Sequence, residues 1–177
     1  ILEGIVDTAS QLRRDAELTR YARKAVDIVG ADVLLLSRLG LRLTEQGDWD
    51  LAAAMYEKVL AAHAQQPQTT TGILIRTELG KLYHLLEKYP QGAEHFLRVV
   101  KILDDPKKSG IDEKTYKEML GEQGALYVLI GECFLLSGKY PEATAAFEKA
   151  NTTAPDKPLY GLNRARVEVK TGKLDDA

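Results

Sequence analysis

The sequence contains a single cysteine, and this scarcity excludes several kinds of site. Cys133 alone cannot form an internal disulfide or supply the cysteine pairs of a structural zinc site. Its neighbours in the stretch ALYVLIGECFLL are apolar, so we expect a small residue buried in the core. A free cysteine also fits a reducing compartment. This favours the cytoplasm, although the sequence by itself does not fix the localisation.

Strong charge of either sign and long apolar runs are also lacking. The formal net charge of the 177 residues is −2, so there is no basic field to attract nucleic acid or an anionic membrane. The longest apolar run is interrupted by Glu132 and is too short to span a bilayer. We therefore expect neither nucleic-acid binding nor membrane insertion. The chain begins with Ile1 and stops at Ala177 within a helical pattern, which we interpret as a fragment of a longer protein.

Catalytic and metal-binding patterns are missing as well. The three histidines, His63, His84 and His95, form no pair at the spacing of metal ligands on one helix. No serine lies in a nucleophile elbow, and no glycine-rich phosphate loop follows a strand. We therefore expect no catalytic residue, no metal site and no cofactor, and predict that the chain is not an enzyme.

What the sequence does contain is helical periodicity along most of its length. Apolar residues recur at three- and four-residue spacing, and alternating β-branched runs are absent. Gly and Pro interrupt the pattern every dozen or so residues. This pattern predicts an all-α chain of short helices.

One pattern recurs after each of three glycines, Gly40, Gly80 and Gly131. A turn residue follows the glycine by seven positions, aromatic residues follow by nine and sixteen, and a small residue follows by twelve. A fourth copy has Ala165 in place of the glycine and continues with Gly172. In chain order, these positions hold Gly47, Trp49, Ala52 and Tyr56, then Glu87, Tyr89, Gly92 and Phe96, then Gly138, Tyr140, Ala143 and Phe147.

This register resembles that of the tetratricopeptide repeat (TPR), a helix–turn–helix of 34 residues. The resemblance implies an all-α fold, an α-solenoid of TPR-like hairpins forming a right-handed superhelix. It also implies that Gly131 and Ala143 let the two helices of a hairpin approach closely, while Phe147 fills the space beside them. Lys149, on the same helix, is expected to contribute almost nothing to stability.

The copies divide the chain unevenly. Residues 1–32 are predicted to be an N-terminal capping helix or degenerate repeat, with a helix from Thr8 to Val29. Insertions are expected at about 67–72 and 107–123, the second with a short helix from about Asp112 to Leu120. The predicted repeats are residues 33–66, 73–106, 124–157 and, in part, 158–177.

The family resemblance also implies a function. Such repeats commonly serve as protein–protein interaction modules that bind a peptide or helix in a concave groove lined by the first helix of each repeat. The alternatives are a structural or self-assembly role, or a regulatory segment of a longer protein, without a ligand of its own. The candidate groove residues are Lys81, His84, Val128, Glu132, Leu135, Leu162 and Arg166. The other matching groove positions hold Leu34, Ser37, Leu41, Thr44, Leu74, Thr77, Ala125, Leu159 and Val169.

Within the third repeat, the stripe of Tyr127, Ile130 and Phe134 is needed for the core of the hairpin. This leaves Val128 and Leu135 to face a ligand. Some members of the family grip the carboxylate of a chaperone tail with Lys, Asn and Arg. Here Ser37 and Leu41 stand where Lys and Asn are required, so we expect no such clamp.

The two predicted insertions yield the first testable prediction. Residues 104–124 and 66–72 are rich in turn-forming residues and poor in apolar ones, so limited proteolysis should cleave first in one of them. Mass spectrometry of the early fragments identifies the cut sites. First cleavage within 125–136 would contradict the predicted repeat boundaries.

Overall fold

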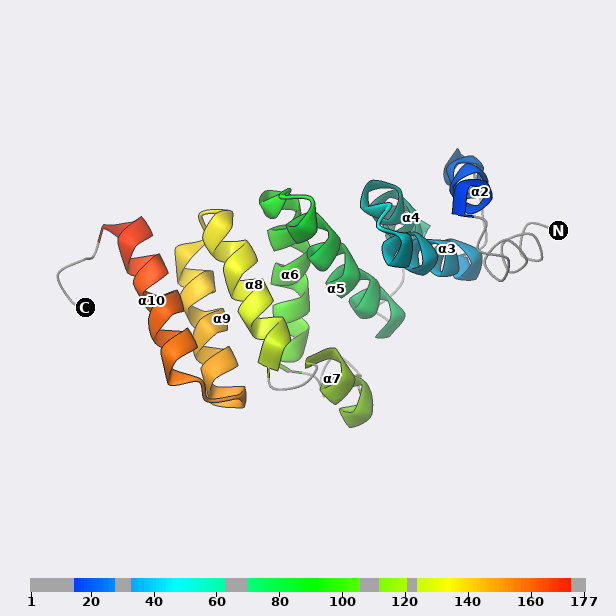
Figure 1. Cartoon of the computed structure of the whole chain (residues 1–177). Coiled ribbons are helices and arrows are strands. Elements are labelled where there is room, and N and C mark those ends of the chain that lie inside the picture. The colour runs from blue at the N-terminus through cyan, green and yellow to red at the C-terminus, as the bar shows by residue number, and fades with distance from the viewer. Residues whose placement is uncertain (1–14, 28–32, 63–69, 106–111, 121–123, 173–177) are drawn as a thin grey trace. The chain divides into compact units, whose positions relative to one another are not determined.

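Helices make up nearly all of the described chain (Figure 1). The computed structural model describes residues 15–27, 33–62, 70–105, 112–120 and 124–172, and these contain no β-strand. The predicted all-α fold class is therefore confirmed. The helices are α2 (Asp15–Asp27), α3 (Val33–Gln46), α4 (Trp49–Ala62), α5 (Thr70–Leu85), α6 (Tyr89–Leu103), α7 (Glu113–Leu120), α8 (Ala125–Leu136), α9 (Tyr140–Thr153) and α10 (Lys157–Thr171).

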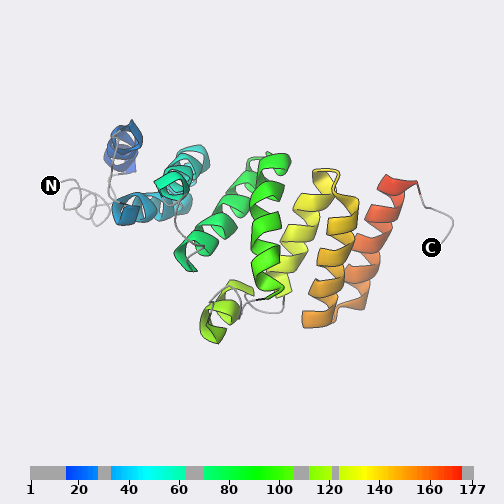
Figure 2. The ribbon, with the colours of Figure 1, turned by 180° about the vertical axis from the view of Figure 1, so that it is seen from behind.

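The chain divides into two compact units, Ile1–Leu86 and Glu87–Ala177. In the first unit α3 packs against α4 and α4 against α5. In the second, α6 packs against α8, α8 against α9, and α9 against α10; Figures 1 and 2 both show α8, α9 and α10 side by side. This consecutive packing is that of TPR-like helical repeats. The boundary between the two units, after Leu86, falls inside the predicted repeat 73–106. The predicted repeat boundaries and the right-handed superhelix therefore stay predictions.

The turn between the two helices of a hairpin has the same hydrogen bonds in both units. Gly47 and Gly138 have φ of +81° and +77°, a left-handed conformation that glycine adopts without steric cost. Around Gly138, the Lys139 amide donates to the Phe134 carbonyl at 2.8 Å and the Gly138 amide to the Leu135 carbonyl at 3.2 Å. The bonds around Gly47 match these residue for residue. Both helices therefore end in a Schellman motif.

The same turn position is left-handed in the other two copies. Gly172 has φ of +73°, and Glu87 has φ of +58°, a value that non-glycine residues rarely adopt. The left-handed residues thus occur seven positions after Gly40, Gly80, Gly131 and Ala165. The backbone supports the register that the sequence pattern predicts.

In the hairpins α3–α4 and α8–α9, a helical glycine lies directly against an aromatic ring. A Cβ atom added at Gly131 would lie 2.4 Å from the nearest carbon of Phe147, and one added at Gly40 would lie 2.7 Å from Tyr56. Both distances are far below van der Waals contact. The three atoms nearest to that added Cβ at Gly131 all belong to Phe147, and the expected contact between Gly131 and Ala143 stays a prediction. Ala143 is nevertheless completely buried.

The core of the first unit joins α2, α3, α4 and α5 through buried apolar side chains, including Ala22 of α2.

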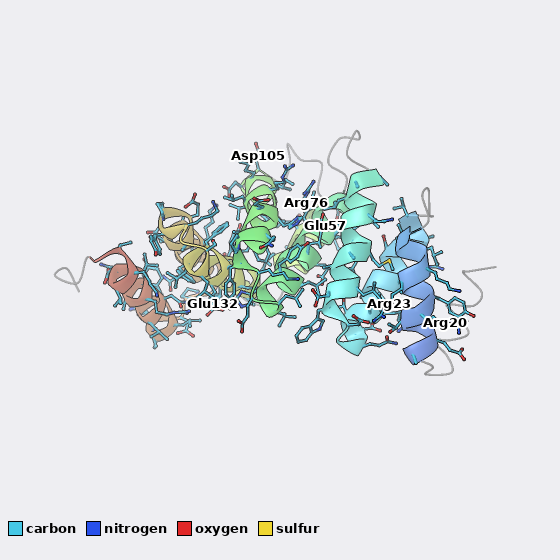
Figure 3. The ribbon with its side chains drawn as sticks, turned by 90° about the horizontal axis from the view of Figure 1, so that it is seen from above. Arg20, Arg23, Glu57, Arg76, Asp105 and Glu132 are labelled. Carbon is cyan, nitrogen blue, oxygen red and sulfur yellow. The ribbon has the colours of Figure 1, made fainter. Side chains whose placement is uncertain are left out.

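Two tyrosines add polar contacts. The Tyr83 hydroxyl of α5 donates to Glu57 Oε1 of α4 at 3.0 Å (Glu57 is labelled in Figure 3). Burial, followed by the charge of Glu57, raises the pKa of Tyr83 to about 12. Burial also raises the pKa of Tyr56 to about 12, with the charge of Glu78 as the next cause.

The core of the second unit centres on α8, which contacts α6, α7 and α9. Cys133 is buried as expected, and its Sγ lies 3.4 Å from the Tyr89 carbonyl oxygen, which accepts its hydrogen bond. Burial raises the pKa of this thiol to about 12. The thiolate form is therefore scarce at neutral pH, which makes the thiol a packing group rather than a nucleophile.

The short helix expected from about Asp112 to Leu120 is present as α7. It belongs to the second unit, where it packs against α8. Lys149 of α9 lies 5.8 Å from the centroid of the Tyr127 ring and forms an ion pair with Asp104. The structure thus gives Lys149 two contacts that the sequence did not predict, because their partners are distant in the chain.

Some expectations lie outside the described residues. Of the helix expected from Thr8 to Val29, the structure describes only Asp15–Asp27, which is α2. Residues 63–69, 106–111, 121–123 and 173–177 also lie outside, and they include His63 and about half of each predicted insertion.

The contact between Gly131 and Phe147 yields a prediction on stability. Gly131→Ala should lower the free energy of unfolding by about 1–3 kcal/mol, because the added methyl group overlaps the ring. The loss should appear although alanine favours a helix over glycine by about 1 kcal/mol.

Gly161→Ala is the matched control, since Gly161 is helical and no atom lies within 4 Å of a Cβ placed there. This variant should be more stable by about 0.5–1 kcal/mol. Urea denaturation measures both changes. A similar change in both variants would contradict the packing described here.

Candidate functional site

The predicted groove residues fall on three helices in the two units. Lys81 and His84 belong to α5 in the first unit. The other five belong to the second unit, with Val128, Glu132 and Leu135 on α8 and Leu162 and Arg166 on α10. Each unit is therefore considered by itself.

Large exposed apolar side chains occur mainly at the predicted groove positions. Leu162 of α10 is 59% exposed. Side chains of this size are more often buried. The exposed groove positions are Leu34, Leu41 and Leu74 in the first unit and Leu159, Leu162 and Val169 in the second; Leu85 and Leu136 are exposed at other positions.

Leu135 does not present an open surface. Its side chain is only 5% exposed, whereas we expected it to face a ligand. The reason is that α8 packs against α6, α7 and α9, so more of its surface is covered than one hairpin requires. Val128, on the same helix, is half-buried.

The charged candidates are paired with neighbouring side chains. Arg166 Nη1 donates to Glu132 Oε1 at 3.0 Å and to Asn163 Oδ1 at 3.0 Å. This links α10 to α8 and supplies a donor to Asn163, which is only 2% exposed. In the first unit, Lys81 forms an ion pair with Glu78 at 2.7 Å.

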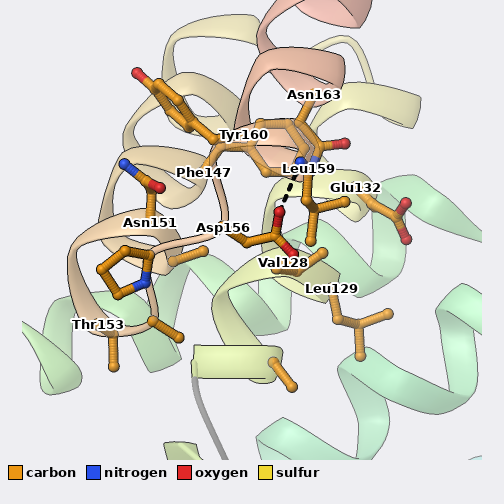
Figure 4. Close-up of a pocket in the computed structure, with 14 residues that line it drawn as sticks. Val128, Leu129, Glu132, Phe147, Asn151, Thr153, Asp156, Leu159, Tyr160 and Asn163 are labelled. Carbon is orange, nitrogen blue, oxygen red and sulfur yellow. Dashed lines mark hydrogen bonds between the residues drawn. The ribbon is translucent and has the colours of Figure 1, made fainter.

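A cavity of about 690 Å³ lies among α8, α9 and α10 (Figure 4). Its walls are both apolar and polar, and the larger apolar side chains are Val128 and Leu129 from α8, Phe147 from α9, and Leu159 and Tyr160 from α10. A volume of this size is typical of ligand pockets. The remaining lining residues are Ala125, Glu132, Ala150, Asn151, Thr153, Ala154, Pro155, Asp156 and Asn163.

Four polar side chains in the cavity were not found by sequence reasoning, namely Asn151, Thr153, Asp156 and Asn163. Asp156 Oδ1 accepts the Leu159 amide at 3.0 Å and so caps α10, as the dashed line in Figure 4 shows. An acidic residue just before a Pro-containing helix start was a readable signal for this cap. Asn151 Oδ1 is buried, and no described residue donates a hydrogen bond to it. Nothing in the local pattern distinguishes Asn151.

The described residues provide no arrangement for metal chemistry. Within the ranges given above, no group of three or more His, Cys, Asp or Glu side chains is placed to hold a metal ion. As for the bilayer, none of the described helices combines the length and the apolar character that a membrane span requires.

The hydrogen bonds of Arg166 yield a prediction on the lining of the cavity. Arg166→Met keeps the aliphatic stem but leaves the buried Asn163 oxygen without its donor, so the protein should lose about 1–3 kcal/mol of stability. Arg164→Met is the matched control on the same helix, because Arg164 only pairs with Glu168 four residues on, at 2.8 Å. That loss should stay below about 0.5 kcal/mol. Equal losses in thermal unfolding would contradict a structural role for Arg166.

Comparison with protein-family models matches residues 35–70 to the tetratricopeptide repeat. These residues include nearly all of α3, all of α4 and the first residue of α5. No curated protein matches the chain significantly. Tetratricopeptide repeats are generally protein–protein interaction modules and are typically non-catalytic, so they suggest another protein as the partner. The resemblance expected from the sequence is therefore confirmed, by a match to the tetratricopeptide repeat over residues 35–70.

Proposed function

We propose that this chain binds a peptide or a helix of another protein on the surface formed by α8 and α10 in its second unit. The observation that carries this proposal is the cavity among α8, α9 and α10 with exposed leucines beside it. Leu159 lines the cavity, and Leu162 lies one turn further along α10. An apolar side chain of a ligand would be removed from water there, at a gain of roughly 25 cal/mol per Å².

The charged candidates have positioning roles in this proposal. Because Arg166 already pairs with Glu132 and Asn163, it holds α10 against α8 and keeps the cavity in shape. An acidic group of a ligand would have to compete with Glu132 for it. Leu135 is not part of the proposed surface, since its side chain is buried.

The first unit offers a second candidate surface on α5. Lys81 and His84 lie on this helix, and Leu74 of the same helix is exposed.

In α3, the Ser37 hydroxyl donates to the Val33 carbonyl at 2.9 Å, and Leu41 is exposed. A small hydroxyl and an apolar side chain cannot supply the cationic and amide donors of a carboxylate clamp. We therefore propose that the ligand is not held by its terminal carboxylate.

The alternative is that the segment has a structural, self-assembly or regulatory role in a longer protein and has no ligand of its own. The two accounts differ in what the second-unit cavity does. If the cavity binds a ligand, substituting Val128, which lines it, should abolish binding and leave the fold intact. If it has no ligand, no peptide should depend on it.

Val128→Lys tests the proposal. This residue is half-buried, so a lysine can extend its ammonium group to water and the protein should stay folded. The ammonium group at the cavity floor should then exclude an apolar ligand, because burying an unpaired charge is costly. Leu136→Lys is the matched control, since Leu136 is exposed on the same helix and does not line the cavity.

The measurement is a selection of random displayed peptides on the wild-type chain, followed by affinity measurements with both variants. We expect the selected peptides to bind the wild type and Leu136→Lys alike and to bind Val128→Lys at least about tenfold more weakly, a difference of roughly 1.4 kcal/mol. Circular dichroism checks that both variants are folded. Peptides that bind all three proteins equally, or a selection without binders, would contradict the proposal.

A further inference from the structure

The buried face of α10 contains a polar side chain. Within this helix, Asn163 and Val167 are the buried residues, and Asn163 is only 2% exposed. Asparagine is a poor helix former, because its side chain competes for backbone hydrogen bonds. An apolar residue at this position would pack without any polar group to satisfy, so a buried amide is favourable here only if its hydrogen bonds are made.

The amide of Asn163 has its acceptor paired and its donor unpaired. Arg166 Nη1 donates to Asn163 Oδ1 at 3.0 Å. Because an arginine side chain can only donate hydrogen bonds, it determines which end of the amide is the oxygen. The NH₂ group of Asn163 therefore points away from Arg166, and no described residue accepts a hydrogen bond from Nδ2. Arg166 is itself held by Glu132 of α8.

The unpaired donor of Asn163 meets the second-unit cavity. Figure 4 shows Asn163 on α10 among the side chains that line the cavity. In contrast to Asn151 Oδ1, which is closed off, Asn163 Nδ2 keeps some accessible surface. Since the rest of the residue is buried, this surface opens into the cavity. Buried donors are nearly always paired in folded proteins, so an unpaired one at a cavity wall indicates an acceptor supplied by a ligand.

The charges of the lining determine which kind of acceptor fits. The cavity is lined by two carboxylates, Glu132 and Asp156, and none of its lining residues is Lys, Arg or His. Arg166 compensates only one of the two, through its ion pair with Glu132. An anionic acceptor would be repelled by the other carboxylate and would lose its hydration. An uncharged carbonyl oxygen accepts the same hydrogen bond without these costs.

We propose that Asn163 Nδ2 donates a hydrogen bond to a main-chain carbonyl of the protein ligand, an inference that rests on the proposed function. Carbonyl groups inside a helix already accept the amide four residues further on, whereas those of an extended segment are free to accept. The ligand is therefore extended where it crosses Asn163. Arg166 is a positioning residue, because it holds the amide in the orientation that presents the donor.

The test uses the tightest peptide obtained from the selection on the wild-type chain. NMR of the isotope-labelled chain follows the side-chain NH₂ signals of Asn163, which should shift on saturation with this peptide. For the bound peptide, we expect strong Hα–HN cross-peaks between successive residues, as in an extended chain. Strong HN–HN cross-peaks between successive residues would instead show a helix.

Two substitutions of Asn163 remove the donor in different ways. Asn163→Asp keeps an oxygen for Arg166 and replaces the NH₂ group by an acceptor. Asn163→Leu is uncharged and should leave the melting temperature about unchanged, because the unpaired donor is removed together with its partner oxygen. Each should bind the peptide about tenfold more weakly, a difference of roughly 1.4 kcal/mol. A purely apolar contact would instead be kept or strengthened by Asn163→Leu.

The positioning role of Arg166 is tested by combining substitutions. Arg166→Met should weaken peptide binding about tenfold in the wild-type chain, because the amide is no longer held. In Asn163→Leu the same change should have little further effect, since residues that act through one another are not additive. Additive losses would overturn the positioning role. Circular dichroism checks that each variant is folded.

Three results would overturn the inference as a whole: unshifted NH₂ signals of Asn163, a helical bound peptide, or wild-type affinity in either Asn163 variant. Peptide binding that depends on Val128 but not on Asn163 would overturn this inference alone. Peptide binding that does not depend on Val128, or a selection without binders, would overturn the proposed function and this inference with it. The two failures are therefore distinguishable.

Discussion

The contact between a helical glycine and an aromatic ring is the constraint on which the rest of the structure depends. Tyr56 lies over Gly40 in the first unit, and Phe147 lies over Gly131 in the second. In each pair the ring occupies the space where any other residue would carry its Cβ. The two helices of a hairpin can therefore approach closely, and the buried ring fixes their register. Left-handed turns at Gly47 and Gly138 close both hairpins in the same way.

This packing is directly connected to the proposed site. Phe147, which fills the space beside Gly131, is only 2% exposed and also lines the second-unit cavity. The hairpin core therefore shapes one wall of the cavity, and the pairing of Arg166 with Glu132 and Asn163 joins the opposite wall, α10, to α8. In the proposed site, binding would therefore share side chains with folding. A substitution that moves the ring would change both the stability of the hairpin and the shape of the cavity.

Much of this fold follows from the sequence because spacing determines which residues share a helix face. The pattern after Gly40, Gly80 and Gly131 predicted the helices and the turn positions, and even Glu87 is left-handed where the pattern placed it. The short helix expected to begin at about Asp112 was also found, as α7, which begins at Glu113. Spacing does not reveal which neighbouring helix covers a face. For this reason the burial of Leu135 was missed.

Most of the polar contacts of the site could not be predicted for a related reason. Arg166 and Glu132 were both expected in the groove, but nothing in the sequence indicated that they pair with each other. The unpaired oxygen of Asn151 depends on the packing of three helices and has no sequence signal at all. The family resemblance indicates a protein partner and says nothing of these contacts.

The most direct test of the central claim is a nuclear Overhauser experiment on the isotope-labelled chain. The account predicts cross-peaks between the Hα protons of Gly131 and the ring protons of Phe147, with the Gly131 signals shifted upfield by the ring. It would be contradicted if the ring of Phe147 showed cross-peaks only to residues outside α8. In that case the hairpin would not be built on this contact, and the cavity wall would not be where the structure has it.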